Sequence, residues 1–396
     1  MMPQRIVSSA AFLAILAVSA CGSSIGQVGT GSPGSAGAGS RENPFKGVRF
    51  FINPAYVANV EATAKRHPDE ADTIRKVEQY PTGLWLDSIA HVANLKGWLD
   101  EAKKQQDASG QPTLAVVVVY DLPNRDCSAA SSAGELLVAE NGEARYKSEF
   151  IDPIFAQFQA HPDQPIVVVL EPDSLGNMAT NMALPKCQEA RSAYKNGIVY
   201  AIKKFALPNV SVYLDAAHSG WLGWDDNRAK IAKIFKNVIG EAGGPQMIRG
   251  FAINTANFTH LSNRDGAVLE PSNPCPNELT YAKVLRQTLA MYGFKDHGFI
   301  IDTSRNGKGN IRAKWGSWCN VHGAGFGERP RAEPEPGIDA YFWVKPPGDS
   351  DGSSDPNGPR YDEMCGGPDA AKGAPQAGEW FDSYFLDLVH NARPPL

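Results

Sequence analysis

The chain has 396 residues, of which 42% are hydrophobic and 20% are charged, and its formal net charge is −5. This length and apolar fraction allow one large α/β domain or two smaller domains, and they exclude a chain that is disordered throughout. The negative charge argues against nucleic-acid binding, which requires a footprint of Lys and Arg.

The first twenty residues have the pattern of a secretory signal peptide. Arg5 precedes an apolar stretch at residues 10–20 that is too short to span a bilayer, and small residues come directly before Cys21. We predict a lipoprotein-type signal peptide at 1–20, export of the protein, and membrane contact only through a lipid on Cys21. A cleaved signal with an incidental cysteine is the alternative. Residues 21–44 are rich in Gly and Ser, which predicts a flexible tether to one domain at 45–396.

Short apolar runs follow, and each ends in a polar or charged cluster. Uninterrupted runs of Val, Ile and Leu are typical of parallel strands that helices cover on both faces. The runs begin at Leu114, Pro165, Val210, Ile248, Gly298 and Asp339, and residues 47–54 form a seventh candidate strand. The segment between 54 and 114 is expected to be largely helical. Amphipathic stretches with helical spacing occur at 146–159, 188–205, 227–242 and 277–292, and their alternation with the strands predicts β/α units.

The clusters at the predicted strand ends are dominated by carboxylates. In a parallel barrel or a doubly wound sheet, functional groups gather where the strands finish, so these acids would share a single mouth. Their mutual repulsion costs stability and therefore indicates a catalytic task. The acids are Asp121, Asp126, Glu171, Asp173, Asp215, Asp302, Asp349 and Asp351, together with Lys345.

Asp173 has the context of a general acid. Pro172 turns the chain out of the sheet, and Asp173 then lies at the rim beside an apolar wall, which disfavours its charged form. Asp126, which follows the neighbouring strand, would raise the pKa of Asp173 further. Pairing with Arg125 or capping of the next helix is the alternative role, and we prefer it for Glu171.

The segments YDLPNRDCSAASSAGE and VVVLEPDSLGN resemble the signature segments of glycoside hydrolase family 6, the inverting cellulases that include cellobiohydrolases and endoglucanases. The resemblance continues through YLDAAHSGWLGW, GFAINTANF, DTSRNG, WGSWCNVHGAGFG, WVKPPGDSDGSSD and APQAGEWF, in collinear order. It implies an α/β fold, a distorted seven-stranded parallel β/α barrel, with the active site at the C-terminal ends of the strands. A cleft or tunnel for a β-1,4-glucan chain would lie there.

The matching positions imply a role for each catalytic residue. Asp173 would protonate the glycosidic oxygen, and Asp126 would raise its pKa. Asp351 would act as the base on a water that Ser132 helps to hold, and Tyr120 would press on the distorted sugar ring. Inversion generally requires about 6.5–9.5 Å between acid and base, so that a water fits between them.

The resemblance also implies which residues contact the glucan. Aromatic platforms match Trp85, Trp221, Trp224 and Trp318, whereas the unmatched Trp343 and Trp380 are expected in the core. Polar contacts match Asp87, Asn181, His218, Asn254, Lys345 and Asp349, with Asp349 standing where a glutamate is common. Cys127 would pair with Cys187 and Cys319 with Cys365, which leaves Cys275 unmatched.

Three hypotheses from different classes remain. The preferred one is a monomeric, exported, inverting β-1,4-glucan hydrolase that needs no metal or cofactor. A glucan-binding lipoprotein that does not cut is the second, and the matched carboxylates argue against it, since binding needs no acid with a raised pKa. A metal-dependent barrel enzyme is the third, and the solitary His218 argues against it. The long segment 351–380, which Cys365 would anchor, favours exo-action with release of cellobiose; endo-action is the alternative.

Overall fold

The computed structural model describes residues 42–263, 270–314 and 316–396. These belong to one compact unit that spans residues 37–396. The predicted signal peptide, Cys21 and residues 22–41 of the predicted tether lie outside the described residues. Among the residues that are described, none of the helices has the length and apolar character needed to cross a membrane.

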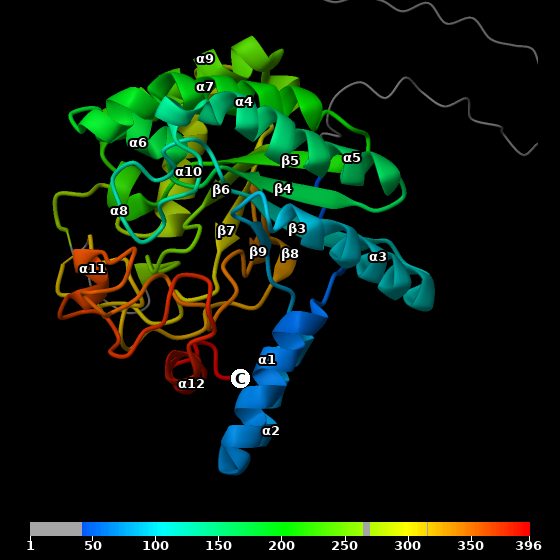
Figure 1. Cartoon of the computed structure of the whole chain (residues 1–396), viewed down its shortest axis with the longest axis vertical. Helices are drawn as coiled ribbons and strands as arrows, with labels where there is room; N and C mark the ends of the chain where they lie inside the picture. Colours follow the sequence, from blue (N-terminus) through cyan, green and yellow to red (C-terminus); the bar gives the residue numbers. More distant parts are fainter. Residues whose placement is uncertain (1–41, 264–269, 315) are drawn as a thin grey trace, which may run out of the picture. The chain divides into compact units, whose positions relative to one another are not determined.

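A mostly parallel sheet forms the centre of the domain (Figure 1). Six strands run parallel in chain order: β3 (Thr113–Val119), β4 (Ile166–Leu170), β5 (Val210–Asp215), β6 (Gly250–Ile253), β7 (Gly298–Asp302) and β9 (Ile338–Phe342). Alternate residues of β3 pack on opposite faces, with Val117 against the outer helices and Val118 inside the curled sheet. Both faces are therefore buried, which explains why these strands are continuous apolar runs.

Two short strands share the seventh position, beside β3. The predicted strand at 47–54 is present as β1 (Arg49–Phe50), which pairs with the beginning of β3. The end of β3 pairs with β2 (Leu84–Leu86), which lies in the segment expected to be helical. A parallel bridge between Thr82 and Trp343 then joins the β2 side of the sheet to the β9 side. The carboxyl end of the sheet is thereby curled towards closure, as a distorted barrel requires.

One strand departs from the parallel pattern. Strand β8 (Arg331–Glu335) pairs antiparallel with β9 at the edge of the sheet. Its side chains alternate between exposed and half-buried, and Arg331, Glu333 and Glu335 are the exposed ones. Charged side chains on an edge strand hinder pairing with another chain.

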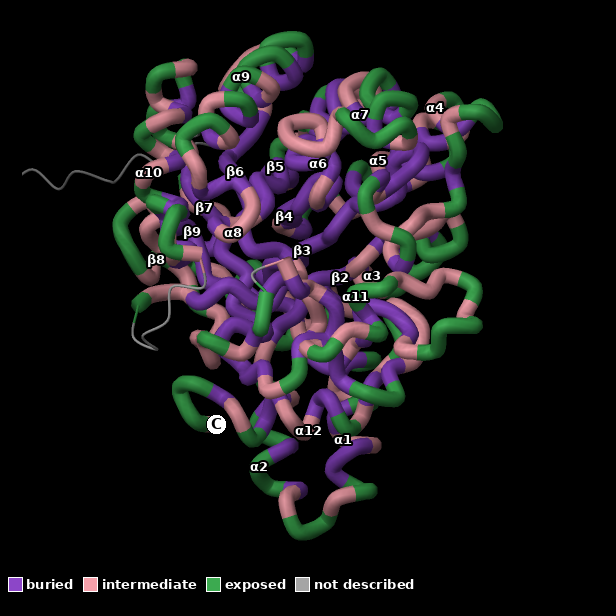
Figure 2. Tube along the Cα trace, turned by 90° about the vertical axis from the view of Figure 1, so that its left-hand side faces the viewer, coloured by how far each residue is buried: buried purple, intermediate pink, exposed green. Residues whose placement is uncertain are grey.

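Helices cover the outer face of the sheet, and Figure 2 shows their exposed residues away from the buried strands. The predicted helices correspond to α5 (Asp152–Ala160), α7 (Pro185–Lys204), α9 (Asp225–Ala242) and α10 (Glu278–Ala290), and a π-helical turn (Tyr146–Ile151) leads into α5. The other helices are α1 (Pro54–Arg66), α2 (Ala71–Arg75), α3 (Val92–Ser109), α4 (Gly142–Arg145), α6 (Ser174–Thr180), α8 (Ser219–Leu222), α11 (Glu363–Gly366) and α12 (Asp382–His390). Short 3-10 turns occupy Pro68–Glu70, Lys76–Gln79, Val138–Glu140 and Pro245–Met247.

Aromatic side chains fill the amino end of the curled sheet. Phe45 lies between Phe50, Tyr213 and Phe342, with ring centroids 5.9–6.2 Å apart. This end is therefore packed, and the polar residues lie at the opposite, carboxyl end, where the strands finish. The arrangement leaves the carboxyl end as the place for a functional site.

Candidate active site

A cavity of about 380 Å³ lies at the carboxyl ends of the strands. Every residue predicted to act on or contact the glucan lines it except Asn254 and Trp224. The lining includes Trp85, Asp87, Tyr120, Asp126, Ser132, Asp173, Asn181, His218, Trp221, Trp318, Lys345, Asp349 and Asp351. The structure thus brings together residues from loops that follow nearly all the parallel strands.

Asn254 is buried below the cavity. Its Nδ2 donates to the carbonyl of Asp302 (2.8 Å), and its Oδ1 accepts from the backbone N–H of Thr259 (3.2 Å). The side chain therefore ties the ends of β6 and β7 together, and the sugar contact at Asn254 stays a prediction. Trp224 also lies outside the lining, so its predicted role as a platform finds no support here.

Asp173 lies immediately before α6 with a left-handed backbone, φ 66°. Its N–H donates to Oδ2 of Asp215 (3.0 Å). Burial of the carboxyl, with the negative charges of Asp126 and Asp215 nearby, raises the pKa of Asp173 well above its usual value. This is the electrostatic setting of a carboxylic acid that keeps its proton near neutral pH.

Glu171 has a structural environment, but the donors to its carboxylate are neither Arg125 nor the start of the next helix, the two roles considered from the sequence. Its carboxylate accepts from the Tyr146 hydroxyl (2.7 Å) and from the backbone N–H groups of Asp121 and Leu122 (3.3 and 3.4 Å). Burial nevertheless raises its pKa to about 7. Glu171 therefore holds the end of β3 against β4 and does not line the cavity.

Arg125 does not pair with Asp173. Its guanidinium donates to the carbonyls of Asp87 (2.5 Å), Tyr120 (2.7 Å), Ser132 (2.7 Å) and Ala133 (3.3 Å). It also lies 4.5 Å from the centroid of the Tyr120 ring. Arg125 is therefore the group that fastens the loop of Ser132 to the ends of β2 and β3.

Asp126 is oriented by two side chains. It accepts a short hydrogen bond from the Ser132 hydroxyl and a second one from Nδ2 of Asn177 (3.3 Å). The adjacent Cys127 is joined to Cys187 at the start of α7 by a disulfide, as the resemblance implied. Asp126 is thus held beside Asp173 by contacts from both ends of its loop.

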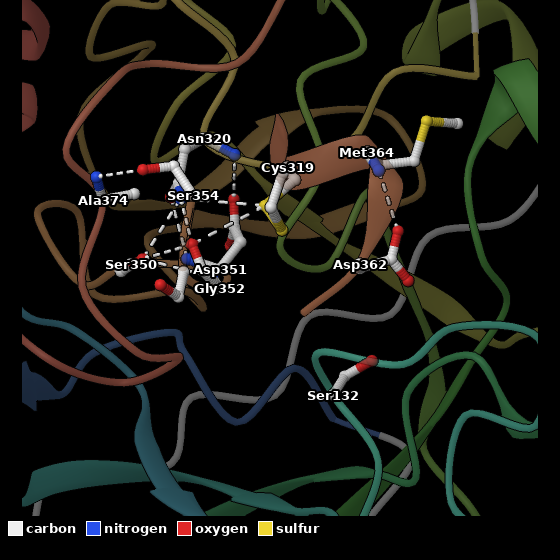
Figure 3. Close-up of a disulfide and its surroundings, with 12 residues drawn as sticks. Ser132, Cys319, Asn320, Ser350, Asp351, Gly352, Ser354, Asp362, Met364 and Ala374 are labelled. Carbon is white, nitrogen blue, oxygen red and sulfur yellow. Dashed lines mark hydrogen bonds between the residues drawn. A yellow bond between two sulfur atoms is a disulfide. The ribbon is translucent and has the colours of Figure 1, made fainter. Parts of the chain in front are cut away.

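Asp351 has one carboxylate oxygen engaged inside the protein. Oδ2 accepts from Nη1 of Arg305 (2.7 Å) and from the N–H of Asn320 (2.8 Å). Oδ1 lies 3.7 Å from Nζ of Lys345. Figure 3 shows Asp351 grouped with Asn320, Ser350 and Gly352, while Ser132 projects from a separate loop. Oδ1 is therefore the oxygen that remains for a water on the cavity side.

Two loops meet over the cavity. The N–H of Ala130 donates to Oδ2 of Asp362 (2.8 Å), which lies far away in the sequence. A Cβ added to Gly352 would lie 2.6 Å from the Cβ of Ser131, so only glycine allows this close approach. The second loop is anchored by the disulfide between Cys319 and Cys365. We call residues 128–132 and 351–365 together the roof of the cavity.

The tryptophans divide into cavity and core residues. Trp85 presents one edge to Tyr120 (centroids 5.6 Å apart) and its Nε1 donates to the carbonyl of Val344 (2.8 Å). Trp343 is fully buried and stacks on Phe326 (4.8 Å), in agreement with its predicted place in the core. Trp380 is half-buried and packs against the hydrophobic cluster that contains Trp343 and Phe326.

Sequence reasoning missed some residues of the site. Arg305 stands inside the matched segment DTSRNG, but nothing in that pattern indicates that its partner is Asp351. Asn257, Arg312 and Arg360 also line the cavity. Among the described residues, no cluster of three or more His, Cys, Asp or Glu side chains could hold a metal ion. Cys275 is buried and has a free thiol.

Comparisons with known proteins show which sequences and folds this chain is similar to. The sequence profile of "Glycosyl hydrolases family 6" matches residues 45–392. "Exoglucanase 3" of Agaricus bisporus is 42% identical over 357 residues, which cover 89% of this chain and 80% of that protein. The CcCel6A catalytic domain with p-nitrophenyl β-D-cellotrioside superposes with a TM-score of 0.86 at 43% identity, over 90% of this chain and 99% of that one. Cellobiohydrolase II (Cel6A) from Humicola insolens with glucose and cellotetraose gives 0.86 at 41% identity, over 90% and 100%.

Proposed function

Because the chain belongs to glycosyl hydrolases family 6, we propose that it hydrolyses β-1,4-glucosidic bonds of cellulose and cello-oligosaccharides with inversion at the anomeric carbon. It is therefore a glycoside hydrolase, and relatives of the same family are named exoglucanase and cellobiohydrolase. The observation that carries the proposal is the pairing of Asp173 and Asp126 in one cavity, where burial and like charge keep Asp173 protonated.

Asp173 acts as the general acid. It donates its proton to the glycosidic oxygen as the bond to the leaving sugar breaks, and Asp126 both raises the pKa of Asp173 and offsets positive charge on the sugar ring. Tyr120, which lines the cavity and lies against Trp85, presses on the distorted ring. Asp215 holds the backbone of Asp173 and contributes to its raised pKa.

Water attacks from the opposite face of the sugar. Oδ1 of Asp351 and the hydroxyl of Ser132 hold this water, because both residues line the cavity from separate loops. Ser132 also donates to Asp126, so a proton from the water has a hydrogen-bonded route through Ser132 towards that carboxylate. No side chain forms a bond to the anomeric carbon in this scheme.

A non-catalytic glucan-binding protein is the alternative from another class. Trp85, Trp221, Trp318 and Lys345 in the cavity wall suit either function, because sugar binding needs stacking faces and hydrogen bonds. The half-buried acid at Asp173 favours the enzyme, since a desolvated carboxyl costs stability and adds nothing to binding alone.

The roof favours exo-action. The Ala130–Asp362 hydrogen bond and the Gly352–Ser131 contact join the two loops over the cavity, so a glucan chain is threaded from an end. We propose that cellobiose units are released, in line with the relatives that are named cellobiohydrolase. Endo-action is the second candidate and requires the two loops to separate.

The sequence features outside the described residues extend the proposal to location. A signal peptide at 1–20, a lipid on Cys21 and the tether at 21–44 would place a monomeric catalytic domain, residues 45–396, outside the cytoplasm. Substitution of Cys21 by serine is expected to abolish incorporation of labelled fatty acid. Equal labelling of the wild type and the variant would refute the proposed lipid anchor.

Two experiments test the proposed chemistry. One determines the anomeric configuration of the first product, and the other compares the effect of an Asp173 variant on substrates with different leaving groups. Proton NMR of the first turnover on cellohexaose should show the α-anomer before mutarotation, and an initial β-anomer would overturn the assignments of Asp126 and Asp351. Asp173→Asn should reduce turnover of cellohexaose by about 10²- to 10⁴-fold and should be much milder on an aryl glycoside with a good leaving group. Asp107→Asn is the matched control, because this exposed aspartate pairs with Lys103 on α3 and does not line the cavity.

A further inference from the structure

His91 is a histidine next to the cavity that the chemistry proposed above does not use. Its Nδ1 lies 2.5 Å from Oδ1 of Asp87, and Asp87 lines the cavity whereas His91 does not. The two residues are four positions apart, in the turn that joins β2 to α3. Their side chains are 54% (His91) and 35% (Asp87) exposed. His91 therefore lies behind Asp87, and we expect any effect of His91 on a ligand in the cavity to pass through the Asp87 carboxylate.

The hydrogen bond between these two side chains has a defined direction. An ionised carboxylate can only accept a hydrogen bond, so Nδ1 of His91 carries the hydrogen and donates it. The bond engages Oδ1 of Asp87. It therefore leaves Oδ2 of the same carboxylate to accept from a hydroxyl group of a ligand in the cavity.

The backbone of this turn is fixed by contacts from another loop. The guanidinium of Arg125 donates to the carbonyl of Asp87 (2.5 Å), and Oε1 of Glu135 accepts from the N–H of Ile89 (2.7 Å). Both partners belong to the loop after β3, which also carries part of the roof. With the backbone held, rotation of the Asp87 side chain is the main freedom that remains, and the hydrogen bond from His91 restricts that rotation.

His91 does not serve as a cap for α3. It stands directly before Val92, the first residue of the helix, at the position where Ser, Thr, Asp or Asn usually accept from backbone N–H groups. Within the described residues 42–263, its side chain makes no such capping hydrogen bond. A positive charge is also unfavourable at this end of a helix, because the N-terminus carries a partial positive charge. The contact with Asp87 is therefore the interaction that explains a histidine at this position.

Asp87 belongs electrostatically to the groups of the cavity. Burial is the main cause that raises the pKa of Asp349 to about 6, and the negative charges of Asp351 and Asp87 add to the rise. On the other side of Asp87, the Trp85 ring has Nζ of Lys345 5.5 Å from its centroid. The carboxylate thus lies beside a predicted sugar platform, where its orientation and charge act on a bound ligand.

We propose that His91 is a positioning residue for glucan binding: it holds the Asp87 carboxylate so that Oδ2 accepts from a sugar hydroxyl beside Trp85. The inference rests on the proposed function, because it assigns the hydroxyl to the glucan that this function requires. An ionised acceptor forms a stronger hydrogen bond than a neutral one. A carboxylate that is already held in one orientation also loses less side-chain entropy when the sugar binds.

The test measures binding without turnover, in full-length protein that carries Asp173→Asn. Affinity for cellotetraose is measured by calorimetry after His91→Leu, His91→Asn, Asp87→Ala, and His91→Leu combined with Asp87→Ala. Leucine has no donor, whereas the amide nitrogen of asparagine can occupy the place of Nδ1. His390→Leu is the matched control, because His390 pairs with Glu70 at a similar exposure (50% and 40%) and neither residue lines the cavity.

The dissociation constant should rise about two- to fivefold in His91→Leu, the effect of one partly exposed charged contact. His91→Asn should restore most of the affinity. After Asp87→Ala, the change His91→Leu should have no further effect, because the group that His91 positions is gone. With Asp173 restored, His91→Leu should raise KM for cellohexaose and leave kcat nearly unchanged, since this contact is the same in the ground state and the transition state. His390→Leu should change none of these values.

Two results would overturn the inference. One is an unchanged affinity in His91→Leu. The other is a loss of affinity that is equal with and without the Asp87 carboxylate, since a merely structural role of His91 at the start of α3 predicts this. If His91→Leu does not fold, His91→Asn and His91→Ser decide: serine suits the start of a helix but is too short to replace the donor, so equal affinity in both refutes the role. Failure of the Asp173→Asn parent to bind cellotetraose would instead overturn the proposed function itself, and the inference with it.

Discussion

Replacing Arg305 with methionine should lower the free energy of unfolding by about 3–5 kcal/mol, because it leaves the Asp351 carboxylate buried without its main counter-charge. The side chains of Arg305 and Asp351 are 0% and 7% exposed, and Nη1 and Oδ2 are 2.7 Å apart. The same guanidinium lies 4.2 Å from the ring centroid of Phe258 and donates to the carbonyl of Ala256. The methionine variant loses these contacts as well.

A double-mutant cycle with Asp351→Asn separates the ion pair from those other losses. Two unit charges about 4 Å apart attract each other by about 4 kcal/mol at an effective dielectric constant of about 20. Desolvation of both groups offsets part of this attraction, and Asp351 keeps its contacts with Lys345 and Asn320. We therefore expect a coupling of about 2–3 kcal/mol, so the double variant is less destabilised than the sum of the single ones.

Urea unfolding followed by tryptophan fluorescence measures the three stabilities, and cellohexaose hydrolysis measures the catalytic effect. Arg249 and Asp339 provide the matched control, because they form a buried pair (2.6 Å) at the opposite end of the sheet. Arg249→Met should destabilise comparably and leave kcat unchanged, whereas Arg305→Met should lower kcat because Asp351 is no longer held. Single-variant costs that add within about 0.5 kcal/mol would refute the pairing of Arg305 with Asp351.

Three further changes test other parts of the site. Trp318→Ala should weaken cellohexaose binding about three- to tenfold without a change in melting temperature. Trp343 is buried, so Trp343→Ala should lower the free energy of unfolding by about 3–5 kcal/mol. The opposite pattern would exchange the roles of the two tryptophans. Gly352→Ala should force the roof apart at Ser131 and so favour internal cutting of the chain. On soluble cellulose, the loss of viscosity per reducing end formed should therefore increase. An unchanged ratio would contradict the roof contact. Burial raises the pKa of Asp349 to about 6 from an ordinary value of 3.8, so the folded protein favours the neutral carboxyl. The contribution of this neutral carboxyl to stability is fully present below pH 3.8 and is lost as the pH rises through 6. Asp349→Asn should therefore raise the melting temperature at about pH 7 and not at about pH 3.5; equal gains at both would rule out titration of this group.

Local sequence patterns were sufficient to predict a strand or helix wherever that element has a strong pattern of its own. The run LAVVVV before Tyr120 is buried on both faces, so its apolar character is continuous and visible without the fold. Strand β2 was missed because Leu84–Leu86 is too short to display a pattern. It is extended because it pairs with β3, which lies about thirty residues further along the chain.

The chemistry of single residues was predictable to a similar degree. An acid that follows a buried strand and a proline was expected to have a raised pKa, and the burial of Asp173 beside Asp126 has that effect. Asn254 was placed in contact with sugar from its matching position. Whether such a side chain faces the cavity or the interior depends on the φ and ψ of the strand end, and its left-handed φ of 61° is not visible in the sequence.

The sequence by itself determined the parallel β/α architecture, the gathering of acids at one mouth and the family, because each depends on residues that are adjacent or collinear in the chain. Only the tertiary structure decided which groups meet: Asp351 with Arg305, Ala130 with Asp362, and Arg312 with Thr259. These partners lie far apart in sequence, and they come together because parallel strands carry their following loops to the same end of the sheet. Hydrogen bonds and ion pairs act over a few ångströms, so the partners of each group depend on packing that no local pattern encodes.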